Sequence, residues 1–515
     1  MRGILQAAAP GFAEDLDRLC EEMRGIQYHW GLRFEHADGD LGLDPETIRI
    51  IALHLLRQGV TILEIMTGLE LLTTVVSDED IELIREIALL QGDYGYAATK
   101  MLRTCSNPGH SLHWLAVRSS IPDQTTYTDA LAALSAEDIE PLLAELNAAD
   151  RVELIRMMSH RSHTPTWMQG GKQFAVPLAL AAKRPELFGP GLSGLTGIVQ
   201  VRDDLLYGHS AFLEIEQGLR ASIARDLLAA LQAPERRALV SAALALDPHD
   251  SEAIWLHQYI ERADDGDGDF PPGLAIRIAV PAPATGQPPR THLVVDGVPL
   301  VTNLFDLGVP DSPSRLLHRK QGLRARAEVH EVWLAEADCT EGCCGVLAAQ
   351  IRRDEASGQV LWEVKATRSR SEPTPFTFNA DEYDAEVARA EEDRSWEWPA
   401  LQAARLLNQR LRDEPALLDR WDCRNGGVGS WNSDRSLLQL HLWHPEPPNP
   451  DRPWLQFKYP VKVLDSITVD NGAIAARVEE ILERLRTTDP KLAGQVCGGS
   501  QAHAEALGYP WPPPR

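Results

Sequence analysis

The densest group of residues able to do chemistry is a cysteine cluster formed by Cys339, Cys343 and Cys344. Thiolates bind Zn²⁺ well, and a tight turn can bring two or three of them within about 2.3 Å of one ion. Adjacent cysteines on a strand point to opposite faces, so Cys343 and Cys344 share a site only where the backbone leaves the strand. The alternatives to zinc are a redox pair or disulfide, and turn packing with buried thiols. A fourth zinc ligand can come from one of three further residues: His330, Cys423 or Cys497.

Histidines form two pairs, His110 with His113 and His160 with His163. Spacing of i, i+3 on a helix can place two imidazoles on one metal ion. Neither pair has a carboxylate or cysteine at metal-ligand spacing, and the HExxH motif is absent. We therefore interpret these histidines as surface or interhelical hydrogen-bonding residues.

Two glycine-rich stretches, 189–194 and 426–430, have the composition of phosphate-binding loops. The first matches G-x-G-x-x-G as a string, but no strand precedes it, and the second lacks the lysine of a P-loop. We expect both stretches to be loops. The nucleophile elbow G-x-S-x-G does not occur in a strand-to-helix setting, so a hydrolase built on it has no support.

Tryptophans are concentrated late in the chain, at positions 396, 398, 421, 431, 443 and 454. Tryptophan is enriched at interface hot spots, so Trp396 and Trp398 are candidates for a binding face. The alternative is that they fill the core of a small α+β domain. Acidic residues between 381 and 393 should form the solvated side of the neighbouring helix. An acidic face edged by tryptophan would suit a basic partner.

The cysteine cluster lies among predicted strands at 273–280, 291–296, 325–336, 344–353 and 359–367, which we expect to form a meander. The segment 355–358 has the composition of a hairpin turn. Asn379 should cap a long helical stretch that runs to about Arg412 and is bent or broken at Trp398–Pro399. Strands at 436–444 and 454–460 and a helix at 472–487 complete a predicted α+β domain with an antiparallel sheet.

The N-terminal half contains successive short amphipathic helices. Asp44–Pro45–Glu46 is a good helix entry, and a further helix should follow Ser77 to Asp80. More helices are predicted at 136–147, 149–158, 219–232 and 234–246. Short helices joined by short loops cannot bury an apolar face alone, which favours an all-α HEAT-like solenoid, with a helical bundle as the alternative. Glycine and proline interrupt the pattern between 160 and 215.

The boundary between the two halves is a stretch of like charges, Gly and Pro that neither helix nor strand can cross. The predicted organisation is a helical HEAT-like domain at 1–262, a linker at 263–272, an α+β domain at 273–507 and a proline-rich extended tail at 508–515. Four of the thirteen tryptophans precede the linker, which supports this division.

The chain has 515 residues and a net charge of −25, with a pI near 5.1. This charge argues against nucleic acid or anionic lipid and favours a basic or neutral protein partner, although acidity is also an ordinary solubility device. No stretch approaches the ~18 apolar residues of a membrane span, and the start lacks the hydrophobic run of a secretory signal. A cytoplasmic protein without membrane contact is therefore expected.

Five segments of the second half carry distinctive motifs: CTEGCCG at 339–345, YDAEVARA at 383–390, SWEWP at 395–399, RLRTTDP at 484–490 and CGGS at 497–500. These motifs resemble those of a family of uncharacterised actinobacterial proteins. The resemblance covers most of 290–512 and implies a domain identity without an assigned activity. The helical half separately resembles HEAT-like repeat proteins, which implies the roles of scaffold, inhibitor or immunity factor.

The first functional hypothesis is a non-enzymatic scaffold or inhibitor that binds a protein through an acidic groove. Neutralisation of a toxin or nuclease, as an immunity protein does, is its most concrete form. The alternative is a metal- or thiol-dependent enzyme centred on Cys339, Cys343 and Cys344. A third hypothesis is a small-molecule sensor with a cavity between the domains.

Overall fold

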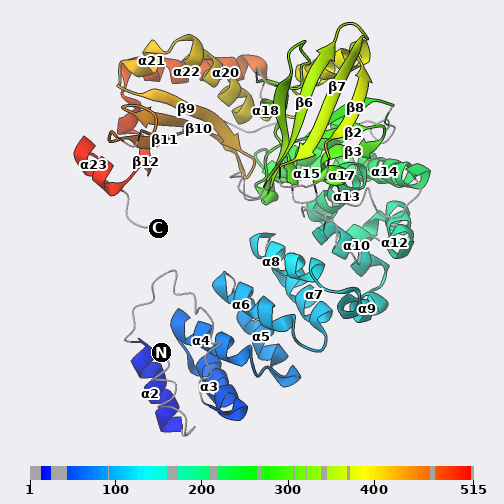
Figure 1. The fold of residues 1–515 in the computed structure, drawn as a ribbon, viewed down its shortest axis with the longest axis vertical. Coiled ribbons are helices and arrows are strands. Elements are labelled where there is room, and N and C mark those ends of the chain that lie inside the picture. Colours follow the sequence, from blue (N-terminus) through cyan, green and yellow to red (C-terminus); the bar gives the residue numbers. More distant parts are fainter. Residues whose placement is uncertain are drawn as a thin grey trace. The chain divides into compact units, whose positions relative to one another are not determined.

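The computed structural model describes residues 13–24, 43–90, 92–119, 121–158, 172–208, 217–263, 270, 272–305, 308–319, 322–337, 345–367, 372–449, 451–463 and 470–511. The chain forms two compact units, Met1–Pro177 and Leu178–Arg515. Helices are followed by an α+β region whose strands pair antiparallel, as predicted (Figure 1). Most of the predicted linker at 263–272 lies outside the described residues, so the boundary placed there stays a prediction.

The first unit is helical. Its helices are α2 (Ala13–Arg24), α3 (Pro45–Gln58), α4 (Ile62–Leu72), α5 (Ile81–Ala88), α6 (Asp93–Leu102), α7 (Pro108–Arg118), α8 (Ile121–Ala132), α9 (Ala136–Glu145) and α10 (Ala148–Met158), with a 3-10 turn η1 (Asp78–Asp80) before α5. The two predicted helix entries are confirmed. Asp44 accepts a hydrogen bond from the Thr47 amide at 3.0 Å, and Ser77 forms a capping box with Asp80. These caps satisfy amides that the first turn of a helix leaves without partners.

The helices of the first unit pack in two ways. Neighbours in sequence pack as pairs, α3 with α4, α5 with α6 and α7 with α8. Helices that are separated by one helix in the sequence also pack against each other. These contacts join α4 with α6, α6 with α8 and α8 with α10, and they join α5 with α7 and α7 with α9. The helices therefore form two layers, and α5, α7 and α9 belong to the same one.

The second unit begins with helices and continues into sheets. Helix α12 (Lys172–Lys183) runs into it, followed by α13 (Gly191–Tyr207), α14 (Gln217–Gln232), α15 (Pro234–Leu246) and α16 (Ser251–Arg262). The expectation of a loop at 189–194 is only partly correct. Gly189 is a loop residue with φ +92°, but Gly191 begins α13, because Pro190 in extended conformation provides the N-cap.

The strands that the structure describes form three antiparallel sheets. The first contains β1 (Leu274–Ala279), β2 (Arg290–Val295) and β3 (Val298–Pro299). The second is a meander of β4 (Gly308–Pro310), β5 (His330–Ala337), β6 (Val346–Asp354), β7 (Gln359–Ala366) and β8 (Thr374–Asn379). Short helices α17 (Leu300–Leu304) and α18 (Pro313–Leu316) connect the two sheets. Asp354 pairs with Gln359, which confirms the predicted hairpin.

The third sheet has the order β12 (Gln495–Gly498), β11 (Leu455–Lys462), β10 (Asp434–His444) and β9 (Arg424–Trp431). The prediction that 426–430 is a loop is wrong, because this stretch pairs with β10 as strand β9. Glycine is ordinarily depleted in strands, but at Gly426 the backbone of β10 leaves little room for a side chain. A Cβ on Gly426 would lie 3.0 Å from the His441 carbonyl oxygen.

The remaining helices are α19 (Ala380–Glu392), α20 (Pro399–Asp413), α21 (Ala416–Asp419), α22 (Asn471–Thr487) and α23 (Gln501–Leu507). The predicted break at Trp398–Pro399 is confirmed, and Asn379 caps α19 by accepting the Asp381 and Glu382 amides. Helix α19 packs on β1, β7 and β8, whereas α20 covers β9 and β10.

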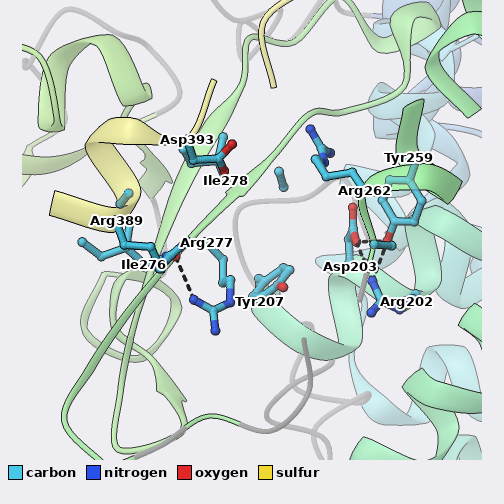
Figure 2. A pocket seen from close by; sticks show the side chains of 13 residues that line it. Arg202, Asp203, Tyr207, Tyr259, Arg262, Ile276, Arg277, Ile278, Arg389 and Asp393 are labelled. Atoms are coloured by element: carbon cyan, nitrogen blue, oxygen red, sulfur yellow. Dashed lines mark hydrogen bonds and ion pairs between the residues drawn. The ribbon is translucent and has the colours of Figure 1, made fainter. Parts of the chain in front are cut away.

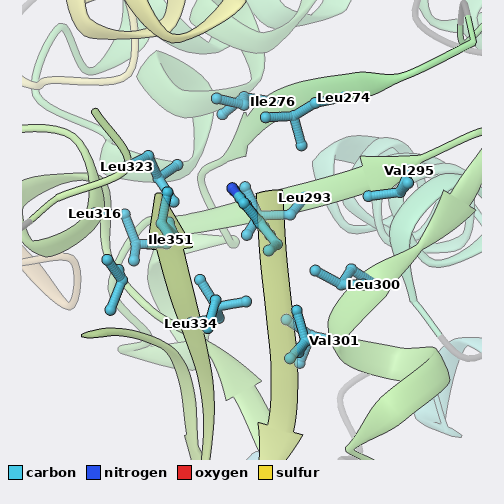
Figure 3. Close-up of a cluster of buried hydrophobic side chains, with 14 of the residues drawn as sticks. Leu274, Ile276, Leu293, Val295, Leu300, Val301, Leu316, Leu323, Leu334 and Ile351 are labelled. Atoms are coloured by element: carbon cyan, nitrogen blue, oxygen red, sulfur yellow. The ribbon is translucent and has the colours of Figure 1, made fainter. Parts of the chain in front are cut away.

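The main core of the second unit lies between the first two sheets (Figure 3). Leu274, Ile276 and Leu293 from β1 and β2 face Leu334 and Ile351 from β5 and β6. Buried apolar area of this kind contributes about 25 cal/mol per Å², so this layer is a major source of stability. Val387 and Ala390 of α19 belong to the same core, so α19 packs against β1.

Candidate functional site

A groove of about 830 Å³ lies in the first unit, between η1 and α5, the start of α7, and the end of α9. We call it the acidic groove. The residues that line it are Asp78, Glu79, Ile81, Glu82, Arg85, Glu86, Asn107, His110, Ser111, Trp114, Pro141 and Glu145. The three helices that form it belong to one layer of the unit, so their packing holds its walls in place.

Carboxylates dominate the walls of the acidic groove. Glu82 and Glu86 lie one turn apart on α5, and both are exposed. Asp78 and Glu79 lie in the 3-10 turn η1, directly before α5. Acidic residues at this position interact favourably with the positive end of the helix dipole. Glu145 adds a fifth carboxylate from α9, with 73% of its side chain exposed. Exposed carboxylates keep their negative charge at neutral pH and can bind cationic groups of a partner.

A tryptophan flanked by two arginines lies on one side of the groove. Arg85 donates to the Ser111 hydroxyl at 2.9 Å, and its guanidinium lies 5.6 Å from the centre of the Trp114 ring. Arg118 lies closer to the same ring, at 4.3 Å. Burial lowers the pKa of the Arg85 guanidinium from its usual value. The Trp114 ring therefore already binds guanidinium groups through cation–π contacts within this chain.

The first predicted histidine pair lies on α7, next to the groove. His110 Nε2 lies 3.0 Å from Glu145 Oε2, so this pair joins α7 to α9. Burial lowers the pKa of His113, and its Nε2 is buried. His160 and His163 lie outside the described residues. Where the structure describes the chain, no three His, Cys, Asp or Glu side chains come together as metal ligands would.

The predicted zinc ligands Cys339, Cys343 and Cys344 lie outside the described residues. The strands on either side, β5 and β6, pair with each other through Glu336 and Val346. The segment that carries the cysteines therefore connects two neighbouring strands, as predicted. The zinc site itself stays a prediction.

The three candidates for a fourth ligand lie apart in the fold, on β5, before β9 and on β12. His330 Nε2 is 3.0 Å from the Gly322 carbonyl oxygen. Cys423 is buried with its sulfur 3.6 Å from Lys491 Nζ, and Cys497 is exposed. His330 Nε2 and Cys423 thus already have partners within the protein.

Trp396 and Trp398, the predicted interface residues, are buried, with 3% and 1% of their surface exposed. The Trp396 indole donates to the Asp393 carbonyl at 2.9 Å, and the Trp398 indole donates to the Ser430 hydroxyl at 2.8 Å. The guanidinium of Arg435 lies 5.1 Å from the Trp398 ring. Neither ring offers a surface to a partner in this fold. The burial of both rings supports the alternative that they fill the core of the α+β domain.

Two of the tryptophans on described strands are exposed, Trp333 at 45% and Trp431 at 56%. Each indole N–H has a partner on its own sheet, the Glu331 carboxylate and the Gln439 amide oxygen. In the sequence analysis, Trp431 belongs to the same group as the buried Trp396 and Trp398. A local concentration of tryptophans does not show which of them are buried in the fold. The alternation of side chains along a strand could have revealed the exposure of Trp333, because its neighbours Val332 and Leu334 are buried and point to the other face of the sheet.

No protein-family model, no curated protein and no solved structure matches this chain. No helix of the described segments is both long enough and apolar enough to cross a lipid bilayer. The functional conclusion therefore depends on the geometry and charge of the acidic groove.

Proposed function

We propose that this protein is a non-enzymatic scaffold or inhibitor that binds a basic segment of a partner protein in the acidic groove. The observation that carries the proposal is the charge of the described lining residues, which comprise five carboxylates and the guanidinium of Arg85, with Arg118 next to Trp114. A segment rich in arginine or lysine supplies the opposite charge. Complementary charge of this kind increases the association rate and selects against acidic partners.

We further propose that α3 to α10 form an irregular HEAT-like solenoid. The support is the packing of α3 with α4, α5 with α6 and α7 with α8, combined with the contacts of α4, α6, α8 and α10 along one layer and of α5, α7 and α9 along the other. Helical repeats stacked in this way expose extended grooves on one layer, and many such proteins use these grooves to bind peptides. The acidic groove lies on the layer of α5, α7 and α9.

Trp114 is half-buried and already contacts Arg85 and Arg118, so an arginine of the partner would displace or share the contact that Arg118 makes with the ring. Such a cation–π contact contributes about 0.5–1 kcal/mol. The carboxylates of Glu82 and Glu86 lie on the neighbouring helix and can pair with the same group or with the next basic residue. Arginine should therefore bind better than lysine, because its planar group can stack and bind a carboxylate at the same time.

The test uses a fluorescein-labelled peptide of alternating arginine and glycine, with binding to the full-length protein followed by fluorescence anisotropy. The double variant Glu82→Gln, Glu86→Gln removes two exposed charges without shortening the side chains. We expect it to weaken binding about 3- to 10-fold at low salt, since exposed ion pairs contribute up to about 1 kcal/mol each. Binding of the unmodified protein should fall steeply between about 0.1 M and about 1 M salt.

The matched control is the double variant Glu137→Gln, Glu140→Gln, which removes the same charge from exposed positions of α9 outside the groove. This control should bind the peptide like the unmodified protein. Equal weakening by both double variants would mean that only net charge matters, and the proposal would fail. Affinity purification from the native host, run in parallel with the groove variant, then identifies the partner as the protein retained only by the unmodified chain.

A further inference from the structure

A second cavity, of about 330 Å³, lies within the second unit. One side is formed by the last turns of α13 and α16, and the other by β1 and the end of α19 (Figure 2). Four arginines line it, Arg202, Arg262, Arg277 and Arg389, and we call it the arginine cavity. Such a concentration of guanidinium groups is unexpected in a chain with a net charge of −25.

Two of the arginines each donate to the protein through two different nitrogen atoms. Arg202 is buried, and it donates to the Tyr259 hydroxyl at 2.8 Å and to the Ala224 carbonyl at 3.3 Å. Arg389 donates to the Glu386 carboxylate at 2.6 Å and to the Ile276 carbonyl at 2.6 Å. These contacts fix the two walls of the cavity.

The other two arginines have donors left over. Arg277 uses only one nitrogen, which contacts the Ile276 carbonyl at 3.0 Å and Glu386 at 3.3 Å. Arg262, on the opposite wall, makes no hydrogen bond or ion pair within the described part of the chain. Figure 2 shows both side chains beside the space between the walls. Each guanidinium carries five N–H donors and no acceptor, so both groups have donors that water or the acceptor atoms of a ligand can use. Arg277 also lies 5.8 Å from the centre of the Phe270 ring.

The carboxylates near the cavity already accept hydrogen bonds. Asp203 accepts from the Tyr259 hydroxyl at 2.6 Å, and Asp393 accepts from the Ser395 amide at 2.9 Å. Helices α13, α16 and α19 all end here, and arginines in last turns complement the partial negative charge of helix C-termini. This effect does not explain Arg277, because it lies on strand β1.

Two tyrosines, Tyr207 and Tyr259, contribute to the lining of the cavity. The ring of Tyr207 stacks on His292 with 5.0 Å between ring centres, and its backbone carbonyl accepts from the Thr302 hydroxyl at 3.2 Å. Burial, followed by the charge of Arg290, lowers the pKa of His292 to about 3, so this imidazole is neutral at neutral pH. A preformed cavity of this kind binds a ligand without a large cost for ordering side chains.

We propose that the arginine cavity binds a small organic molecule through an oxyanion group, a phosphate or a carboxylate, held between Arg262 and Arg277. Guanidinium groups match the geometry of both oxyanions and bind them bidentately. One water molecule takes up about 30 Å³, so a cavity of about 330 Å³ is large enough for a molecule the size of a sugar phosphate. It lies between helices and strands that the sequence assigned to different domains, where the sensor hypothesis expected a cavity.

The test is isothermal titration calorimetry on the full-length protein with three probes: inorganic phosphate, ribose 5-phosphate and succinate. Binding of ribose 5-phosphate but not succinate identifies a phosphate ligand, and the reverse identifies a carboxylate ligand. The double variant Arg262→Gln, Arg277→Gln should reduce the affinity for the probe that binds by about 10-fold or more, because charge-assisted bidentate hydrogen bonds are among the strongest. Failure of all three probes to bind overturns the proposal.

The matched control is Arg352→Gln, Arg412→Gln, which removes two arginines at exposed positions on β6 and α20. It should leave binding unchanged, and an equal loss in both double variants would contradict the proposal. If the double variant unfolds, the single variant Arg262→Gln replaces it in the test. This variant should remain folded, since Arg262 makes no described hydrogen bond or ion pair that the substitution would remove. If this folded single variant binds as the unmodified protein does, the proposed role of Arg262 is wrong.

Discussion

The indole N–H of Trp255, on α16, donates to the backbone carbonyl of Val280 at 2.8 Å. This hydrogen bond crosses the stretch that the sequence marked as an interdomain linker. Tyr207 and Ala224 of the preceding helices also pack with Ala275 and Val294 of the first sheet. Helices α13 to α16 are therefore part of the same packed unit as the strands that follow them.

We predict that a fragment spanning 178–515 is more stable than one spanning 273–515. The shorter fragment loses the cover of Ala275 and Val294 and leaves apolar surface of β1 and β2 exposed, at a cost of about 25 cal/mol per Å². Thermal unfolding of the two purified fragments measures the difference. Equal midpoints would instead support a domain boundary at the predicted linker.

Replacing Trp398 with alanine should destabilise the protein by about 3–5 kcal/mol, because it leaves a large cavity beneath α20 and removes the contact with Arg435. The exposed Trp431 provides the comparison, and its replacement with alanine should cost less than about 1 kcal/mol. Urea denaturation gives both values. A small effect at Trp398 together with lost partner binding would restore the original interface hypothesis.

His318 should make the protein sensitive to acid. Its Nε2 lies 2.7 Å from a nitrogen of Arg394, which can only donate, so the imidazole must be neutral to accept this hydrogen bond. Burial, followed by the charges of Arg394 and Arg405, lowers the pKa of His318 to about 4 from 6.5. The unfolded chain therefore binds a proton below pH 6.5 that the folded protein does not, and stability is lost as pH falls toward about 4.

The loss contributed by His318 should be at most about 1.4 kcal/mol per pH unit within this window. A glutamine at this position can accept the same hydrogen bond but does not titrate. The free energy of unfolding of His318→Gln should thus fall less steeply with acid than that of the unmodified protein. Parallel slopes for the two proteins would show that His318 does not contribute.

Local chemistry made much of the fold predictable. The caps at Asp44 and Asn379 and the proline at 399 each determine a helix start through contacts within a few residues. Strand β9 was missed because glycine is rare in strands, and the reasons for it here are the backbone of β10 close to Gly426 and the positive φ of Gly427, +117°. Local propensity carries no information about such a distant neighbour.

The two proposed sites were less predictable for the same reason. The acidic groove combines residues from α5, α7 and α9, and the faces that these helices present to one another depend on packing. In the arginine cavity, Arg262 and Arg277 lie on opposite sides of a stretch that the sequence identified only as a boundary. The charge pattern suggested an acidic surface, but it did not identify where carboxylates or guanidiniums gather.

The layered packing of the first unit also bears on how such a protein can change over evolutionary time. Each helix pair packs against the pairs next to it in sequence, so duplication or loss of a whole pair leaves the remaining contacts intact. Such an event would lengthen or shorten the groove wall in a single step. Chains descended from a common ancestor can therefore acquire new partners by gaining repeats, while the second unit and its cavity stay the same.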